Sequence, residues 1–397
     1  MNNQTKSIHW ASLFLIFFRL GLTAFGGPIA HLAYFRQEFV ARRQWLSEHA
    51  YAELVAFCQF TPGPASSKVG MLLGLSRGGF AGALAAWLGF TLPSAVALVW
   101  FGLEVTAAKL GGNQWHGLQI VAVAVVAQAL WSMGKTLTPD KSRASIAVLA
   151  CAWVSAMPST AGQIGAIALG GLAGAIGLRA YGTLPSSEDF PVHYRKRWGI
   201  FLLSLFAGLL LGLPILNTTM HNDGIELFDR FYRVGALVFG GGHVVLPLLQ
   251  AQVVPSGWVS NSSFLAGYGA TQAVPGPLFT FAAYLGAVST HAPGGWIGAT
   301  IALVAVFLPS FLLVTGILPF WAQLRRHPHM QGVMKGINAA VVGLLLAAFY
   351  QPVWHSAVLN AKDFSWVLGV FALLVFWKTP PWLAVMLAVL AGTLGWV

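Results

Sequence analysis

Charge is scarce in this sequence. Only 8% of its 397 residues are Asp, Glu, Lys or Arg, whereas soluble domains carry about 25%, and 57% of the residues are hydrophobic. Continuous apolar runs of about 18 residues or more, the length that crosses a bilayer as a helix, recur between residues 10 and 397. The composition therefore excludes an ordinary water-soluble protein and predicts an all-α polytopic membrane protein.

Cysteines and long polar stretches are also few. Cys58 and Cys151 are the only two cysteines, which excludes a disulfide framework and a four-cysteine metal site, and we expect both to be small buried residues. The longest polar stretch, TLPSSEDFPVHYRKRW, is too short for a soluble domain. No small-residue cleavage site follows the first apolar run, so we expect that run to be retained as a helix.

Catalytic motifs are absent as well. The sequence has no H-E-x-x-H motif and no acid pair suited to hydrolysis, and Ser66 and Ser67 have no base near them in sequence. An intramembrane enzyme is therefore the weaker alternative. We expect no enzymatic activity, no metal site and no cofactor.

Positive charges exceed negative charges by 11. In a soluble protein such an excess would suggest a nucleic-acid partner. Here the Lys and Arg residues lie in short loops between apolar runs, which is typical of the cytoplasmic loops of membrane proteins. We therefore expect no nucleic-acid partner. The expected partners are the lipid bilayer and a small anion, and the residues leave open whether the chain forms a homodimer.

The sequence repeats itself. Four features recur in the same order at offsets of 213 to 216 residues. They are FRLGLTAFGGP (18–28) and YRVGALVFGGG (232–242), Trp45 and Trp258, QFTPGP (59–64) and QAVPGP (272–277), and LPS (92–94 and 308–310). The chain is thus predicted to be a duplicated unit, as many transporters are.

The charges predict opposite orientations for the two copies. Between FGG and QFTPGP the first copy carries Arg36, Arg42 and Arg43, while the matching stretch of the second copy has no charge. After the LPS motif the distribution of basic residues is reversed, and the second copy carries more Lys and Arg than the first. Because basic loops mark the cytoplasm, we expect two inverted-topology repeats built from glycine/proline-broken helical hairpins, with a cytoplasmic N-terminus. The expected divisions are an N-terminal transmembrane repeat (1–142), connecting transmembrane helices with a basic cytoplasmic loop (143–229), and a C-terminal inverted transmembrane repeat (230–397).

Proline and glycine interrupt the apolar runs at four places. We call these places the first FGG break (26–27), the first PGP break (62–64), the second FGG break (240–242) and the second PGP break (275–277). Proline stops a helix and glycine allows a tight turn. The helix that restarts after each break presents free N–H groups and a partial positive charge, which suits an oxyanion. The alternative is that the breaks only bend helices.

Charged residues at membrane depth are the other candidates for the site. Arg19 and Arg233 each lie seven residues before an FGG break, and Lys68 lies four residues after the first PGP break. The alternative for the arginines is that they extend to an interface or cap carbonyl groups. Glu53 is the candidate proton-coupling carboxylate, and its alternative is an interface residue paired with Lys or His. His31 and His243 follow the FGG breaks and are expected to be packed, hydrogen-bonded side chains rather than anion donors.

The candidate substrate-binding residues come from both copies, since each glutamine adds a neutral donor beside its PGP break. They are Arg19, Gly26, Gly27, Gln59, Pro62, Gly63, Pro64, Ser66, Ser67, Lys68, Arg233, Gly240, Gly241, Gln272, Pro275, Gly276 and Pro277.

These motifs resemble those of the chromate ion transporter family, whose halves each carry an FGG(G)P-type motif followed by Q-x-x-P-G-P. Here the motifs are FGGPIAH, QFTPGP, FGGGHVVLPLL and QAVPGP, and the resemblance covers residues 10–353. One departure is His243, which stands where the family commonly has proline. It leaves the geometry of the second FGG break open.

The resemblance implies a bacterial inner-membrane (plasma-membrane) efflux protein that exports chromate from the cytoplasm and confers chromate resistance. The residues alone favour an oxyanion site at the interface of two inverted repeats. An importer or channel for sulfate or another oxyanion therefore remains the alternative. For either substrate we expect alternating access, in which one repeat rocks against the other around the bound dianion.

Overall fold

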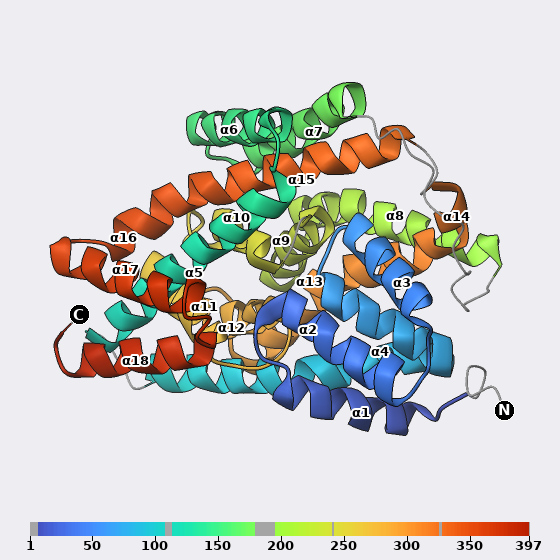
Figure 1. The fold of residues 1–397 in the computed structure, drawn as a ribbon, viewed down its shortest axis with the longest axis horizontal. Helices are drawn as coiled ribbons and strands as arrows, with labels where there is room; N and C mark the ends of the chain where they lie inside the picture. The colour runs from blue at the N-terminus through green and yellow to red at the C-terminus, as the bar shows by residue number, and fades with distance from the viewer. Residues whose placement is uncertain (1–6, 108–112, 179–194, 240–241, 325–327, 397) are drawn as a thin grey trace.

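The computed structural model describes residues 7–107, 113–178, 195–239, 242–324 and 328–396, and all of its regular structure within these ranges is helical. Figure 1 shows a bundle of helices with the N-terminus and the C-terminus on opposite sides of the molecule. The prediction of an all-α protein is therefore confirmed.

The helical elements follow one another with short connections. They are α1 (Trp10–Thr23), α2 (Gly27–Phe35), η1 (Arg36–Arg42), α3 (Glu48–Phe60), α4 (Ala65–Ala107), α5 (Asn113–Leu137), α6 (Lys141–Ala156), α7 (Thr160–Gly177), α8 (Lys196–Met220), α9 (Asp223–Leu237), η2 (Gly242–Val244), α10 (Val245–Val253), α11 (Asn261–Thr271), η3 (Leu278–Thr280), α12 (Phe281–Ala287), α13 (Gly295–Ile317), η4 (Leu318–Phe320), α14 (Trp321–Leu324), α15 (Pro328–Ala348), η5 (Phe349–Trp354), α16 (His355–Ala357), α17 (Ala361–Val375) and α18 (Pro381–Thr393). The elements η1 and η5 are π-helical, and η2, η3 and η4 are 3₁₀ turns.

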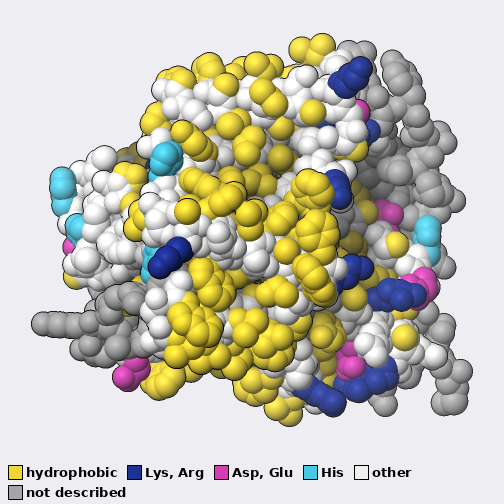
Figure 2. Space-filling view, turned by 60° about the vertical axis from the view of Figure 1, so that its left-hand side comes forward, with side chains coloured by type: hydrophobic (Ala, Val, Ile, Leu, Met, Phe, Trp, Pro, Cys, Tyr) yellow, Lys and Arg dark blue, Asp and Glu magenta, His cyan; other side chains and the backbone are white. Residues whose placement is uncertain are grey.

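Within the described ranges, six helical segments are long and apolar enough to cross a membrane. They are Ala65–Glu104, Trp115–Leu137, Thr160–Gly177, Lys196–Met220, Gly295–Phe320 and His329–Ala357. Figure 2 shows hydrophobic side chains over a broad area of one face, with most Lys and Arg side chains gathered toward its right-hand side. Such an apolar surface suits a lipid environment.

The longest of these segments, α4, folds back on itself. Its backbone leaves helical geometry at Gly78 and Gly79. A Cβ added at Gly74 would lie 2.3 Å from the carbonyl oxygen of Gly82, although eight residues of straight helix would separate the two by about 12 Å. The two arms of α4 therefore form a tight helical hairpin, in which residues 80–107 form the longer arm.

A similar hairpin joins α12 to α13 in the second half. A Cβ at Gly286 would lie 2.3 Å from the carbonyl oxygen of Gly298, so these helices also approach closely. The pair stands 212 to 216 residues after Gly74 and Gly82, the offset of the repeated motifs. Helix α1 packs along α4, and α9 packs along α13 in the same way.

The remaining helices pack across the two halves. Helix α15 packs against α6 and α7, and α5 packs against α17 and α18. Figure 1 shows α6 and α7 lying along α15. Segments far apart in the sequence therefore pack side by side in the fold. The inverted relation itself stays a prediction, as do the expected divisions. The division after residue 142 falls in the first turn of α6, and the division after residue 229 falls in the middle of α9.

Candidate functional site

Helices begin directly after the sequence breaks. Helix α2 begins at Gly27, α4 at Ala65, η2 at Gly242 and η3 at Leu278. Gly240 and Gly241 of the second FGG break lie outside the described residues. The second FGG break continues into a 3₁₀ turn that contains His243, whereas the first continues directly into an α-helix with proline at its start. The departure at His243 thus coincides with a local difference between the two halves.

Backbone hydrogen bonds link each PGP break to the opposite half. The N–H of Gly63 donates to the carbonyl oxygen of Val238 at 2.6 Å, and the N–H of Gly276 donates to that of Ala24 at 2.9 Å. Ala24 and Val238 are the C-cap residues that directly follow α1 and α9, just before the FGG motifs. The two PGP breaks are therefore bonded reciprocally to the helix ends that precede the FGG breaks.

The helix starts also contact one another directly. A Cβ at Gly242 would lie 3.2 Å from Cγ of Pro28 and 3.5 Å from a methyl group of Leu278. The ring of His31 links Ala24 to Ser66, with Nε2 at 3.1 Å from the Ala24 carbonyl oxygen and Nδ1 at 3.3 Å from Ser66 Oγ. The four breaks, although far apart in sequence, thus meet at one place in the fold.

Each LPS motif packs against the PGP break of the opposite half. A Cβ at Gly63 would lie 1.9 Å from Ser310 Oγ, and one at Gly276 would lie 2.8 Å from Ser94 Oγ. Both glycines have positive φ angles, 101° and 99°, which other L-residues rarely adopt. Backbone conformation and close approach therefore both require glycine at these two positions.

Three buried hydroxyl groups near the breaks have no hydrogen-bond partner among the described residues. These groups are Ser67 Oγ in the first turn of α4, Ser310 Oγ beside Gly63, and Thr91 Oγ1 close to Ser94 in sequence. Leaving a buried polar group unpaired costs about 1–3 kcal/mol. Sequence reasoning proposed Ser67 but missed Ser310 and Thr91, because the LPS motif served only to recognise the repeat.

Lys68 is buried and donates hydrogen bonds to Pro62 of the first PGP break and to the preceding Thr61. Its ammonium group donates to the carbonyl oxygens of Thr61 and Pro62, the latter at 3.0 Å, and to Thr61 Oγ1 at 3.0 Å. These acceptors take all three of its protons. In this conformation Lys68 therefore holds the end of α3 and places a positive charge behind the first PGP break. Phe281 stands at the corresponding position of the second half.

The two predicted arginines lie in different environments. Arg233 donates from Nε to Asp229 Oδ1 at 2.9 Å, and Asp229 is buried. Sequence reasoning missed this acid, although its spacing of four residues from Arg233 on one helix favours an ion pair. Arg19 is exposed and, within the described residues, makes no side-chain hydrogen bond or ion pair. It lines a pocket formed by α1, α2 and η1, and no PGP residue lines that pocket.

The two glutamines are not tightly held. Gln59 is exposed on α3. Gln272 ends α11, and its Nε2 lies 3.5 Å from the carbonyl oxygen of Tyr268, the outer limit of a hydrogen bond. His243 on the second side bonds the hydroxyl of Tyr268 at 2.7 Å through Nδ1. Both histidines are thus packed and hydrogen-bonded, as expected.

Glu53 connects the two halves. Its Oε1 accepts a hydrogen bond of 2.8 Å from the indole Nε1 of Trp321. The Trp321 ring lies against Phe57 and Phe60 at centroid distances of 4.9 and 5.2 Å. The carboxylate therefore reaches from α3 to α14 instead of pointing to open solvent.

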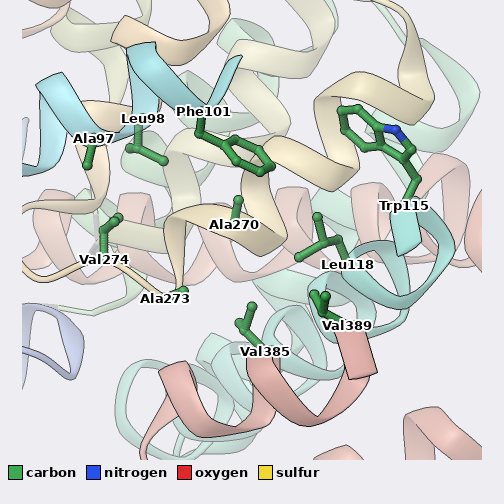
Figure 3. A pocket seen from close by; sticks show the side chains of 10 residues that line it. All are labelled: Ala97, Leu98, Phe101, Trp115, Leu118, Ala270, Ala273, Val274, Val385 and Val389. Atoms are coloured by element: carbon green, nitrogen blue, oxygen red, sulfur yellow. The ribbon is translucent and has the colours of Figure 1, made fainter. Parts of the chain in front are cut away.

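A separate pocket of about 280 Å³ lies beside the second PGP break. Figure 3 shows its lining, in which Phe101, Leu118 and Val385 face the opening from three helices, while Ala273 and Val274 belong to the QAVPGP motif. Every side chain that lines it is hydrophobic. The pocket therefore has no charged side chain in its lining.

The structure defines a multi-pass helical membrane protein whose helices are interrupted where its two halves meet. A sequence model of one family, described as "Chromate transporter", matches residues 11–177 and again residues 225–396. The chain belongs to the chromate transporter family.

Curated relatives agree with this membership. The chain is 27% identical over 405 residues to a protein of Synechococcus elongatus named "Probable chromate transport protein", covering 96% of this chain and 94% of that protein. It is 27% identical over 412 residues to the "Chromate transport protein" of Pseudomonas aeruginosa, covering 98% and 92%. It is 24% identical over 346 residues to the "Chromate transport protein" of Cupriavidus metallidurans, covering 85% and 80%. No solved structure matches the chain significantly.

Proposed function

We propose that this protein exports chromate from the cytoplasm across the bacterial inner membrane by alternating access, and so confers chromate resistance. The observation that carries the proposal is the reciprocal bonding of the two PGP breaks to the opposite halves. These bonds bring helix starts from both halves together, which supports a dianion site between the halves. Family membership supports chromate as the substrate.

The proposed binding groups are neutral donors at helix starts. The first-turn N–H groups after Pro64 and Pro277 have no acceptor inside their own helices, and the partial positive charge at a helix start favours an anion. Unpaired hydroxyls of Ser67 and Ser310 add donors at the first PGP break. Gln59 and Gln272 are the proposed side-chain donors, and Gln272 would exchange its long hydrogen bond to Tyr268 for one to the anion.

Positive charge is supplied from behind this contact region. Lys68 holds its charge one turn into α4, fixed by carbonyl oxygens of the break. Arg233 joins the proposed set with its charge balanced by Asp229, and Arg19 supplies charge from its separate pocket, about 10 Å along α1 from the first FGG break. The first half therefore carries more uncompensated positive charge than the second. The protein makes and breaks no covalent bond in this proposal, so it is a transporter and not an enzyme.

The membrane potential would drive the export of a dianion. With the cell interior negative, each charge moved outward gains about 2.3 kcal/mol at 100 mV, and a dianion gains about twice that. Proton coupling is not needed for this direction. If coupling exists, Glu53 is the proposed carboxylate, because it bridges the two halves through Trp321. The proposal places the N-terminus in the cytoplasm, on the side of the basic loops.

The test is chromate accumulation in energised cells with and without the protein, repeated with excess sulfate. We expect lower chromate accumulation in cells that contain the protein. Excess sulfate should weaken this effect if the site recognises only the shape and charge of the dianion. A control variant is Gly212→Ala on α8, where an added Cβ would meet nothing within 4 Å. This variant should lower chromate accumulation as the wild type does. Higher accumulation would reverse the proposed direction and favour an importer. Unchanged accumulation would overturn chromate as the substrate.

A further inference from the structure

We propose that the pocket between α1, α2 and η1 is a second oxyanion site, which captures a tetrahedral oxyanion group before it reaches the breaks. The ligand is either the free dianion or the phosphate of an anionic lipid headgroup. In its free-dianion form the inference rests on the proposed transport function. The pocket has a volume of about 480 Å³, within the range of about 300–1,000 Å³ found for small-molecule sites.

Three arginines line this pocket. Arg19 comes from α1, and Arg42 and Arg43 come from the end of η1. The acid in the lining is Glu38, which accepts from Arg42 at 2.9 Å and from Arg43 at 2.6 Å. One carboxylate cannot balance three guanidinium groups. The lining therefore carries about two uncompensated positive charges, the number that a dianion would neutralise.

The lining also supplies neutral donors. Tyr34 from α2 and Gln37 from η1 both line the pocket, and both side chains are exposed. Arginine is the preferred partner of tetrahedral oxyanions, because its planar fork can donate two parallel hydrogen bonds. The pocket thus has the charge and the types of donor that suit an oxyanion, in contrast with the uncharged pocket beside the second PGP break.

Local backbone geometry forms this cluster. Residues Arg36–Arg42 are π-helical, a rare conformation that is frequent at functional sites. The wider turn lets the N–H of Arg43 bond the carbonyl oxygen of Glu38 at 3.0 Å, five residues back. Glu38 and the two following arginines are thereby held on one side of the element, facing α1.

The pocket adjoins the crossing of the two halves. Thr23 also lines the pocket and is the last residue of α1. The next residue, Ala24, carries the carbonyl oxygen that receives both the Gly276 N–H and the His31 ring. An anion bound at Arg19 is therefore about 10 Å along the helix axis from the first FGG break, close enough to pass from one site to the other.

The experiment measures transport of chromate into liposomes of phosphatidylcholine, with and without added phosphatidylglycerol. The variants are Arg19→Gln and the double variant Arg42→Gln/Arg43→Gln. Loss of a charge-assisted hydrogen bond should raise the half-saturating chromate concentration about tenfold, with little change in maximal rate. Glu38→Gln should shift it in the opposite direction, because it removes the acid that competes with the anion.

The control is Arg36→Gln. Arg36 belongs to the same element but pairs with Glu48 outside the pocket, and 61% of its side chain is exposed. This substitution should leave the half-saturating concentration unchanged. Because Glu38→Gln should improve capture, a folding defect in the arginine variants cannot by itself explain the full pattern.

The outcomes separate the two possible ligands. Shifts in pure phosphatidylcholine identify the free dianion. Equal transport by all variants in phosphatidylcholine, with phosphatidylglycerol stimulating only the wild type, identifies the lipid phosphate. If the wild type transports chromate and no variant differs in either lipid, the pocket is not an oxyanion site. If the wild type transports no chromate, the proposed function fails. The pocket is then tested by binding of radiolabelled sulfate to the wild type and to Arg19→Gln in detergent. Equal binding to the two proteins would overturn the oxyanion site.

Discussion

Substitution of Gly63 by alanine tests the close contact between the two halves. The added Cβ would lie 1.9 Å from Ser310 Oγ and 2.9 Å from Ser310 Cβ, so the α13 hairpin arm or the break must move. Overpacking of this kind costs about 1–3 kcal/mol. The φ angle of 101° adds strain, at about 1–2 kcal/mol for a residue with a Cβ. We expect a total loss of about 2–5 kcal/mol in the free energy of unfolding.

Two control variants separate these contributions. Gly257→Ala introduces a Cβ at a φ of 77° with nothing within 4 Å, so it reports backbone strain alone. Ser310→Gly in the background of Gly63→Ala removes the clash and retains the strain. The assay is thermal unfolding of the purified protein in detergent, with chromate transport measured on the same preparations. We expect Ser310→Gly to restore about half of the lost stability.

The reasoning fails if Gly63→Ala unfolds at the wild-type temperature, or if Ser310→Gly gives no recovery. The first result would mean that the PGP break does not pack on the LPS motif. The second result would mean that the loss in the free energy of unfolding comes entirely from backbone strain at the break. Gly276→Ala, which would meet Ser94 Oγ at the longer distance of 2.8 Å, should be the milder variant of the two.

Three further predictions concern the charged groups. Lys68→Met should lower the free energy of unfolding by about 1–3 kcal/mol, because carbonyl oxygens of the first PGP break lose their donor; unchanged thermal unfolding in detergent would show that the ammonium does not hold the break. Arg233→Gln should destabilise the protein by about 1–3 kcal/mol, because the buried carboxylate of Asp229 loses its partner, and adding Asp229→Asn should restore stability in the same unfolding assay. Glu53→Gln keeps an acceptor for Trp321 but cannot ionise, so it should abolish any dependence of vesicle transport on a pH gradient while leaving stability within about 1 kcal/mol; persistence of that dependence would exclude Glu53 as the coupling group.

Local chemistry explains which parts of this structure were predictable. Hydrophobic runs specify membrane helices because each run needs only its own length and composition. The helix starts at Gly27 and Ala65 were predictable because glycine and proline act on the adjacent backbone. The all-α class and the position of the breaks therefore followed from short stretches of sequence.

Contacts between distant segments were not predictable in this way. No sequence pattern indicates that Gly63 meets Ser310 or that Gly276 bonds Ala24, because these pairs are separated by about 250 residues of chain. The placement of Arg19 was uncertain for a different reason. Its distance along α1 from the first FGG break was known, but its direction around the helix depends on how α1 packs on α4.

The reciprocal hydrogen bonds offer a physical reason for placing breaks in both halves. A backbone hydrogen bond contributes about 0.5–1.5 kcal/mol net, so the bond from Gly63 to Val238 or from Gly276 to Ala24 is weak enough to open during transport. In the proposed mechanism a bound oxyanion would compete for these N–H groups as well as for the first-turn N–H groups that follow them, and hydrogen bonds to a charged acceptor are roughly twice as strong. Binding of the dianion would therefore loosen contacts that join the halves, and its release would restore them. Because the two bonds are similar in kind, each would open at a similar cost of about 0.5–1.5 kcal/mol, so neither side would be strongly preferred in the alternating access that we propose.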